Sequence, residues 1–331
     1  MTRPIALLCL MIIAAHLPAR GQGCSDAGVC SAGPIGQLQL WQDSTADVVD
    51  YRHFARLGYS YAIGEQGTTI MQANAEISVG IGPRLSVQAK VPYIWASGEL
   101  GENRGIGDAI GTVSYTFLKE HERNITGILG VRLPTGSVTA GVPVYDDNVS
   151  HPMIAYQKPL PLPYQTGLGT TDLLIGVNAR LGHWTAALAY QHVLGYADRN
   201  RFTHGAWFNN ADANRYFESL LLERKDDLVA RLQYAYGCGR LALQPGLLAI
   251  YHVAEDTRLN DFITQENALP ERVSIDGSQG LTLNVTLDLR YKLSDQWAIE
   301  AMLGTPVVTR EVRPDGLTRS LVTGFGLRYR F

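Results

Sequence analysis

Residues 320–331, Ser-Leu-Val-Thr-Gly-Phe-Gly-Leu-Arg-Tyr-Arg-Phe, alternate between two kinds of side chain. Leu321 and Phe325 belong to an apolar set, whereas Arg328 belongs to the other, polar set. Because successive side chains of a strand point to opposite faces, the segment predicts a β-strand with one apolar and one polar face. If the apolar face meets lipid, the sheet has to close, since open edges are not tolerated in hydrocarbon. A strand of this kind ending at an aromatic residue, here Phe331, is typical of transmembrane β-barrels.

The same period recurs upstream. The predicted strands cover residues 54–63, 69–81, 85–95, 107–118, 125–133, 170–181, 184–196, 227–236, 241–253, 281–292, 297–307 and 320–331. Each has about 10 residues, which is enough for a tilted strand to cross a bilayer. The fold predicted for residues 51–331 is therefore an all-β, antiparallel up-and-down barrel of about 12 strands.

The connections between these strands alternate in length. Residues 82–84 and 182–183 are tight turns, whereas residues 134–167 and 197–225 are long polar loops. An even strand number places both ends of the barrel chain on the periplasmic side of a bacterial outer membrane. It also predicts that every long loop lies outside and every short turn inside.

Residues 1–23 resemble a secretory signal. Arg3 precedes an apolar run from Ile5 to Ala15 that is too short to span a bilayer. A short membrane anchor is the alternative, and lipidation of Cys24 is another, although no aliphatic residue stands three places before it. Residues 24–50 are expected to form a periplasmic N-terminal segment or a small plug in the lumen.

Four cysteines are present. Cys9 leaves with the signal, and Cys24 and Cys30 are close enough in sequence to form a disulfide in an oxidising periplasm. A metal pair is the competing interpretation, but no further Cys or His ligand is near. Cys238 has no predicted partner and is expected in a turn.

Composition excludes several classes of protein. The mean hydropathy is −0.04 and no long apolar run follows the signal, which excludes a helical membrane protein. The formal net charge is −3 without a clustered basic face, so a nucleic-acid partner is not expected. No cofactor or metal is predicted, because the histidines are scattered without ligand spacing. A soluble β-sandwich would not need so many strands with all long loops on one side.

Aromatic residues gather near the predicted strand ends. The expected interfacial belts contain Tyr61, Trp95, Phe117, Trp184, Tyr236, Tyr291, Trp297, Tyr329 and Phe331. Ordinary sheet packing is the alternative for any one of them, since aromatic residues favour strands.

Charged residues occupy the face predicted to point inward. They include Arg56 and the expected constriction residues Glu76, Lys90, Asp108, Arg132, Asp172, Arg180, Asp227, Arg231, Asp288, Arg290, Glu300 and Arg328. Charges of both signs in a narrow lumen either pair as a structural interior or filter solutes by size and charge. Both interpretations remain open at this stage.

Catalytic motifs are absent or weak. The sequence has no Gly-x-Ser-x-Gly and no His-Glu-x-x-His. A barrel phospholipase would need a nucleophile beside a base, and the only Ser-His pair is Ser150-His151 within a loop. We therefore predict that the protein is not an enzyme.

Three short motifs recur between strands: Gly105-Ile106-Gly107-Asp108, Leu133-Pro134-Thr135-Gly136 and Gly167-Leu168-Gly169-Thr170-Thr171-Asp172. By themselves, the glycines predict loop-to-strand bends. In this order the motifs resemble the outer-membrane barrel proteins labelled "putative MetA-pathway of phenol degradation". The resemblance covers roughly residues 105–180 and implies a channel proposed to admit aromatic or other hydrophobic compounds, with no catalytic residues.

The predicted function is passive passage of a small solute through an outer-membrane barrel. The expected partners are outer-membrane lipid, the solute, and the barrel-assembly machinery, which would recognise the C-terminal strand. The rival hypothesis is a filled, non-conducting barrel whose long outer loops bind a partner or a surface.

Overall fold

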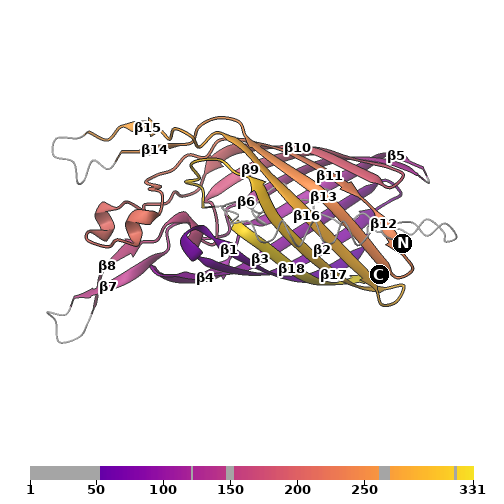
Figure 1. The fold of residues 1–331 in the computed structure, drawn as a ribbon, viewed down its shortest axis with the longest axis horizontal. Helices are drawn as coiled ribbons and strands as arrows, with labels where there is room; N and C mark the ends of the chain where they lie inside the picture. The colour runs from indigo at the N-terminus through magenta and orange to yellow at the C-terminus, as the bar shows by residue number, and fades with distance from the viewer. Residues whose placement is uncertain (1–52, 121, 147–152, 261–268, 317–318) are drawn as a thin grey trace.

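The computed structural model describes residues 53–331 apart from 121, 147–152, 261–268 and 317–318. Within these residues, twelve antiparallel strands form a closed barrel (Figure 1). The barrel strands are β1 (Phe54–Gly64), β2 (Thr69–Ile81), β3 (Leu85–Gly98), β5 (Ala109–Lys119), β6 (Arg123–Leu133), β9 (Thr170–Leu181), β10 (Trp184–Tyr196), β11 (Asp227–Tyr234) continued by β12 (Tyr236–Cys238), β13 (Leu241–His252), β16 (Gly280–Lys292), β17 (Trp297–Val308) and β18 (Arg319–Arg330). The strand prediction is therefore confirmed, with most bounds shifted by only a few residues.

The sheet closes where the first and last strands pair. Residues of β1 and β18 lie opposite one another from Phe54↔Arg330 to Ile63↔Leu321. On the far side of the ring, β11 pairs with both β10 and β13. No barrel strand in the described part of the chain is left with a free edge along its whole length, which is what a hydrocarbon environment requires.

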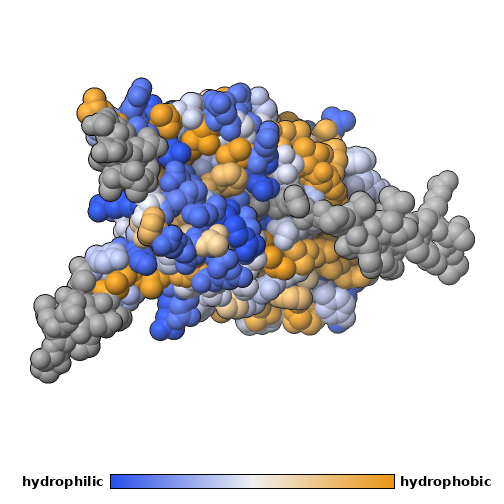
Figure 2. All heavy atoms as spheres, turned by 60° about the vertical axis from the view of Figure 1, so that its left-hand side comes forward, coloured by the Kyte–Doolittle hydropathy of each residue, from blue (hydrophilic) through white to orange (hydrophobic). Residues whose placement is uncertain are grey.

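The outer wall of the barrel is apolar. Leu57, Leu129, Ile175 and Phe325 are all at least half exposed on it. Figure 2 shows hydrophobic side chains over the barrel wall and hydrophilic ones over the end that carries the long loops. Exposed apolar surface around a closed barrel indicates contact with lipid rather than water. Within the described residues, no helix is long and apolar enough to cross a bilayer.

The long loops carry structure that alternation did not predict. β3 runs three residues further than expected and pairs with β4 (Gly101–Ile106), in a region predicted to be a loop. Two hairpins, β7 (Gly141–Asp146) with β8 (Met153–Pro159) and β14 (Thr257–Leu259) with β15 (Arg272–Ser274), extend beyond the barrel end (Figure 1). Short 3₁₀ turns, η2 (Glu65–Gly67), η3 (Leu162–Tyr164), η4 (Gly205–Trp207) and η5 (Ala213–Arg215), complete this end.

Two sequence predictions about turns are wrong. The β1–β2 connection is on the long-loop side but spans only Glu65 to Thr68, so not every short turn lies at the other end. Cys238 is the last residue of β12 rather than part of a turn. The turn falls at Gly239, whose φ of +59° is a conformation that glycine adopts without strain. The signal, the predicted Cys24–Cys30 disulfide and the segment 24–50 lie outside the described residues.

Candidate functional site: the lumen and its outer mouth

The inner part of the lumen, toward the short turns, contains a cluster of ion pairs. Glu300 of β17 lies within 2.7 Å of Arg56 Nε, 2.5 Å of Arg290 Nη2 and 2.9 Å of Arg328 Nε. Arg56 also approaches Glu76 of β2 at 3.5 Å. Adjacent strands bring these residues together because all of them occupy inward positions.

Lys90 completes this inner cluster, and the ring of Phe54 adjoins it. Lys90 is buried directly opposite Glu76 in the β2–β3 register. The Arg328 guanidinium lies 4.1 Å from the centre of the Phe54 ring, a cation–π distance. We define the inner cluster as Arg56, Glu76, Lys90, Arg290, Glu300 and Arg328.

A separate pair occupies the wall between β11 and β16. Arg231 Nη2 lies 2.6 Å from Asp288 Oδ2, which also accepts a hydrogen bond of 2.6 Å from Gln233. The side chains of Arg231 and Asp288 are only 9% and 5% exposed. Removal of either one would leave the other as a buried charge without its counter-ion.

The outer mouth holds a second network. Arg132, whose side chain is 0% exposed, pairs with Asp172 and donates to Thr170 Oγ1 at 2.8 Å. Its Nε lies 4.0 Å from Asp108, and Gln191 of β10 also donates to Asp172. Contacts with these acceptors offset the free-energy cost of burying the Arg132 guanidinium.

His252 links β11 to the β13–β16 loop within the outer network. Its Nδ1 lies 2.7 Å from Asp227 Oδ1 and its Nε2 lies 2.8 Å from Asp256 Oδ1. Arg224 contacts Asp227 at 3.0 Å and Asp315 at 3.9 Å. The imidazole of His252 thus has a carboxylate at each ring nitrogen, and it donates a hydrogen bond to both carboxylates when both nitrogens carry a proton. We define the outer network as Asp108, Arg132, Asp172, Arg224, Asp227, His252, Asp256, Arg310 and Asp315.

Arg310 and Asp315 connect the β17–β18 loop to this network. Arg310 contacts Asp315 at 2.7 Å and donates to the Ser278 carbonyl at 2.8 Å. Although burial opposes it, the guanidiniums of Arg310 and Arg224 lower the pKa of Asp315, so this carboxylate stays ionised.

The three glycine-containing motifs meet at the mouth. Gly136 N and Leu168 N donate to the two oxygens of Asp108 at 3.1 and 2.9 Å. Thr135 Oγ1 donates to the Gly107 carbonyl at 2.6 Å and accepts from Ala109 N at 2.9 Å. The motifs therefore form a clamp around the Asp108 carboxylate that fixes both ends of the β6–β9 loop.

Glycines are needed where the clamp is tightest. A Cβ on Gly136 would lie 2.7 Å from the Thr166 carbonyl oxygen, and one on Gly167 would meet the Asp108 carboxylate. These contacts go beyond the simple loop-to-strand bend that the glycines alone predict.

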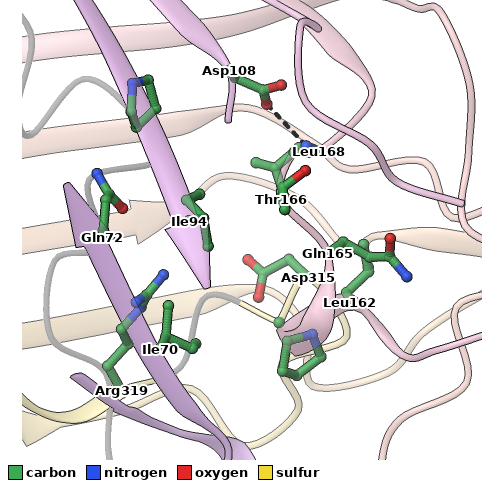
Figure 3. Close-up of a pocket in the computed structure, with 14 residues that line it drawn as sticks. Ile70, Gln72, Ile94, Asp108, Leu162, Gln165, Thr166, Leu168, Asp315 and Arg319 are labelled. Atoms are coloured by element: carbon green, nitrogen blue, oxygen red, sulfur yellow. Dashed lines mark hydrogen bonds between the residues drawn. The ribbon is translucent and has the colours of Figure 1, made fainter. Parts of the chain in front are cut away.

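The clamped loop folds inward over the mouth. Leu160, Tyr164 and Thr166 are almost fully buried, and Tyr164 donates or accepts a hydrogen bond of 3.0 Å with Tyr216. A cavity of about 40 Å³ remains between this loop and the wall (Figure 3). Ile70, Gln72 and Ile94 line it from β2 and β3, and Leu162, Gln165 and Thr166 from the loop.

Charged groups reach the same cavity. Asp108, Asp315 and Arg319 line it together with the apolar residues (Figure 3). The cavity beside the loop is thus small and amphipathic.

One wall of the lumen is apolar, which the alternation did not predict. A buried cluster comprises Ile110, Ile128, Leu174, Ala187, Ala189, Val229 and Leu248, all at inward positions of β5, β6, β9, β10, β11 and β13. The available signal was a break in alternation, as in Leu173-Leu174-Ile175 and Leu247-Leu248, where apolar residues follow one another. The loop residues Asp256, Arg310 and Asp315 gave no such signal.

The predicted constriction residues fall into these groups. Glu76, Lys90, Arg290, Glu300 and Arg328 belong to the inner cluster, Asp108, Arg132, Asp172 and Asp227 to the outer network, and Arg231 and Asp288 form the separate pair. Arg180, half-buried on β9, belongs to none of the three.

The predicted belt residues lie along the outer wall or at its ends. Tyr61, Phe117, Trp184, Tyr236, Tyr291, Trp297 and Phe331 are exposed, and Trp95 and Tyr329 are half-buried. Trp297 and Tyr329 pack with their ring centres 4.7 Å apart. Their contact with an interface remains a prediction.

Comparison with known proteins gives similarity of fold. No family model and no curated protein matches the chain. The COG4313 outer membrane channel from Pseudomonas putida F1 matches with a TM-score of 0.54 and 12% identity, over 88% of this chain and 100% of that one. The NanC porin matches with a TM-score of 0.44 and 8% identity, over 84% and 100%. Outer membrane phospholipase A from Escherichia coli matches with a TM-score of 0.36 and 9% identity, over 85% and 98%.

This chain is an outer-membrane β-barrel. The closed twelve-stranded sheet, its apolar outer wall and the fold that it shares with the COG4313 channel agree on this point. The motifs resemble a more specific family, the one labelled for phenol degradation, but no family model matches this chain.

The enzyme hypothesis depended on Ser150 and His151, which lie outside the described residues. Among the histidines described, His192 and His252 contact carboxylates, and His204 contacts Glu218 and the Tyr216 carbonyl. These contacts join loops to strands.

Proposed function

We propose that the protein is a passive channel of the bacterial outer membrane for small amphipathic or hydrophobic solutes. The observation that carries this proposal is the mouth cavity, which Ile70, Ile94 and Leu162 line together with Asp108 and Arg319. A solute with an apolar body and a polar group fits such a lining better than a sugar does.

The apolar lumen wall supports the same class of solute. It places Ile128, Leu174 and Val229 below the charged mouth, so an apolar body leaving the mouth meets apolar surface next. The motif resemblance, which implies aromatic or hydrophobic compounds, points in the same direction.

Single-channel recording in planar bilayers tests the channel, and liposome swelling tests the solute class. We expect discrete conductance steps, and faster entry of small aromatic alcohols and amides than of sugars of equal size. A purified, folded barrel that shows neither conductance nor uptake would refute the channel.

A loop-mediated binding role is the second candidate. Its support is the pair of outer hairpins, together with Phe208 and Leu269, which are 81% and 79% exposed at the loop end. Exposed apolar side chains on loops mark contact sites for partners or surfaces. Phe208→Ser combined with Leu269→Ser should then weaken cell-surface binding and leave conductance intact.

A further inference from the structure

Three polar side chains form a cluster on the outer wall of the barrel, at its long-loop end. The Tyr190 hydroxyl donates a hydrogen bond to Asp226 Oδ2, and His192 Nδ1 lies 2.8 Å from the same oxygen. The backbone N–H of Val193 donates to Asp226 Oδ1 at 3.0 Å. An ionised carboxylate only accepts hydrogen bonds, so the contact with His192 places a proton on Nδ1. We define the outer-wall cluster as Tyr190, His192 and Asp226.

The outer-wall cluster faces away from the lumen. The side chains of Tyr190 and His192 are exposed, whereas Gln191 between them is buried, as the alternation of a strand requires. Apolar residues flank the cluster along β10, since Leu188 is 49% exposed and Leu194 is 57% exposed. The cluster is therefore a polar island on a wall that otherwise contacts acyl chains.

The energetics of such an island indicate where in the membrane it lies. A charged side chain on the lipid face of a barrel costs most at the midplane of the bilayer and little near the interface. Asp226 directly precedes the first residue of β11, at the end that carries the long loops and faces the cell exterior in this class of barrel. The cluster is thus level with the lipid headgroups of the outer leaflet.

The cluster offers one hydrogen-bonding atom to these headgroups. Asp226 holds Nδ1 of His192, and the imidazole stacks on the Tyr190 ring, 11° from parallel with the ring centres 6.3 Å apart. Nε2 of His192 has no partner among the described residues, and the side chain is 48% exposed. The ring is therefore fixed at one nitrogen and open at the other. When both nitrogens are protonated, Nε2 donates to an anionic oxygen.

A second donor lies on the same face, two strands away. Leu228 stands opposite Tyr190 in one register and opposite Tyr251 of β13 in the other, so the two tyrosines share an outward row. Gln279 Nε2 donates to the Tyr251 hydroxyl at 3.3 Å, which leaves the proton of that hydroxyl available to another acceptor. Neighbouring strands are about 4.8 Å apart, so the hydroxyl and the imidazole are separated by roughly 10 Å.

We propose that this face of β10, β11 and β13 binds a phosphorylated glycolipid of the outer leaflet. His192 donates from Nε2 to a phosphate oxygen, a charge-assisted hydrogen bond, and Tyr251 donates to a second oxygen of the same headgroup. Two donors this far apart suit a headgroup built of sugar rings better than the single phosphate of a phospholipid. Asp226 and Tyr190 are positioning residues that hold the imidazole. The inference goes beyond the proposed channel function and does not depend on it.

Native mass spectrometry of the detergent-solubilised barrel with added diphosphoryl lipid A tests the site. We expect one bound lipid per unmodified barrel and about tenfold weaker binding to His192→Phe, because one hydrogen bond to a charged group is lost. Phenylalanine keeps an aromatic ring against Tyr190 and suits a lipid-facing position, so this variant should fold. Unchanged affinity of His192→Phe would overturn the proposal.

His183→Phe is the matched control. It removes an imidazole from the short turn at the other end of the barrel and should leave the affinity for lipid A unchanged. Dephosphorylated lipid A should bind the unmodified barrel about as weakly as diphosphoryl lipid A binds His192→Phe. Phosphatidylglycerol should also bind more weakly, and an affinity equal to that of lipid A would overturn the assignment to a glycolipid.

A double-mutant cycle tests the positioning role of Asp226. Asp226→Asn should weaken the binding of lipid A to the unmodified barrel and have no further effect in the His192→Phe background, because the carboxylate acts through the imidazole. Additive losses in the double variant would show that Asp226 supports the wall in general, which would refute its role in holding His192 for the lipid.

Discussion

The backbone N–H of Leu168 donates a 2.9 Å hydrogen bond to the carboxylate of Asp108, a residue 60 positions earlier in the chain. Gly136 N donates to the other oxygen of the same carboxylate. One side chain thereby holds the two ends of the β6–β9 loop, the segment that narrows the mouth. Hydrogen bonds to an ionised acceptor are stronger than neutral ones, so this clamp is well suited to fix a loop.

Asp108→Ala should therefore widen the mouth. Removal of the carboxylate leaves two loop N–H groups without their acceptor and frees Arg132 to pair with Asp172 alone. We expect a rise in single-channel conductance of about twofold or more, because a pore's narrowest part controls its current. Glu102→Gln on exposed β4 removes a charge from the same barrel end and should leave the current unchanged. Equal conductance of Asp108→Ala and the unmodified barrel would contradict the clamp.

Gly136→Ala tests the same clamp without a change of charge. The new methyl group would lie 2.7 Å from the Thr166 carbonyl oxygen and 2.8 Å from the Gly167 backbone, so the loop has to shift. Overpacking of this kind costs about 1–3 kcal/mol, here in the local stability of the loop. The expected readout is faster hydrogen exchange of the amides in residues 162–168.

Gly111→Ala on β5 is the control for this change, since no atom lies within 4 Å of a Cβ at that position. Exchange as slow in Gly136→Ala as in Gly111→Ala would show that the loop does not depend on the close approach of Gly136 and Gly167.

The sequence predicted the barrel well for a local physical reason. Alternation is a property of neighbouring residues, so Leu281 to Tyr291 reveal their strand and its two faces without reference to the rest of the chain. The inward charges Glu300 and Arg290 followed from the same parity, and the register then brings them opposite each other.

The mouth could not be predicted in this way. The contact of Asp108 with Leu168, and that of His252 with Asp256, depend on how loops return to the barrel, which no local period records. The three motifs marked the positions of the clamp, yet the role of Asp108 required the fold of the loop between them. Loops have no repeating geometry from which such contacts follow.

Glu65 gives the mouth a dependence on pH. Burial raises the pKa of this carboxyl from 4.5 to about 7, with Arg313 opposing the shift and Asp315 adding to it. Between about pH 4.5 and pH 7, the Glu65 carboxyl is therefore mostly neutral in the closed mouth, whereas it is ionised in an opened mouth where water reaches it. The stability of the closed mouth is therefore greatest below about pH 4.5 and falls as the pH rises to about 7, by about 3 kcal/mol.

Hydrogen exchange of residues 65–68, corrected for the intrinsic rate at each pH, measures this effect. We expect greater protection at pH 5.5 than at pH 8.5 in the unmodified barrel. Glu65→Gln, which keeps a neutral side chain at every pH, should remove the difference. Protection that is independent of pH in the unmodified protein would show that Glu65 does not govern the closed state.

Lysine substitutions on the outer wall test the depth of the lipid contact. Leu129 lies in the middle of β6 and Leu181 at the end of β9, and the two are exposed to a similar extent, 55% and 57%. A lysine at mid-membrane depth costs about 2–4 kcal/mol, whereas one near the interface costs about 0–1 kcal/mol, because there the ammonium reaches water. Leu129→Lys should therefore lower the free energy of unfolding from lipid vesicles by the larger amount, and Leu181→Lys by the smaller. Equal, small losses at both sites would mean that water rather than acyl chains surrounds the middle of β6.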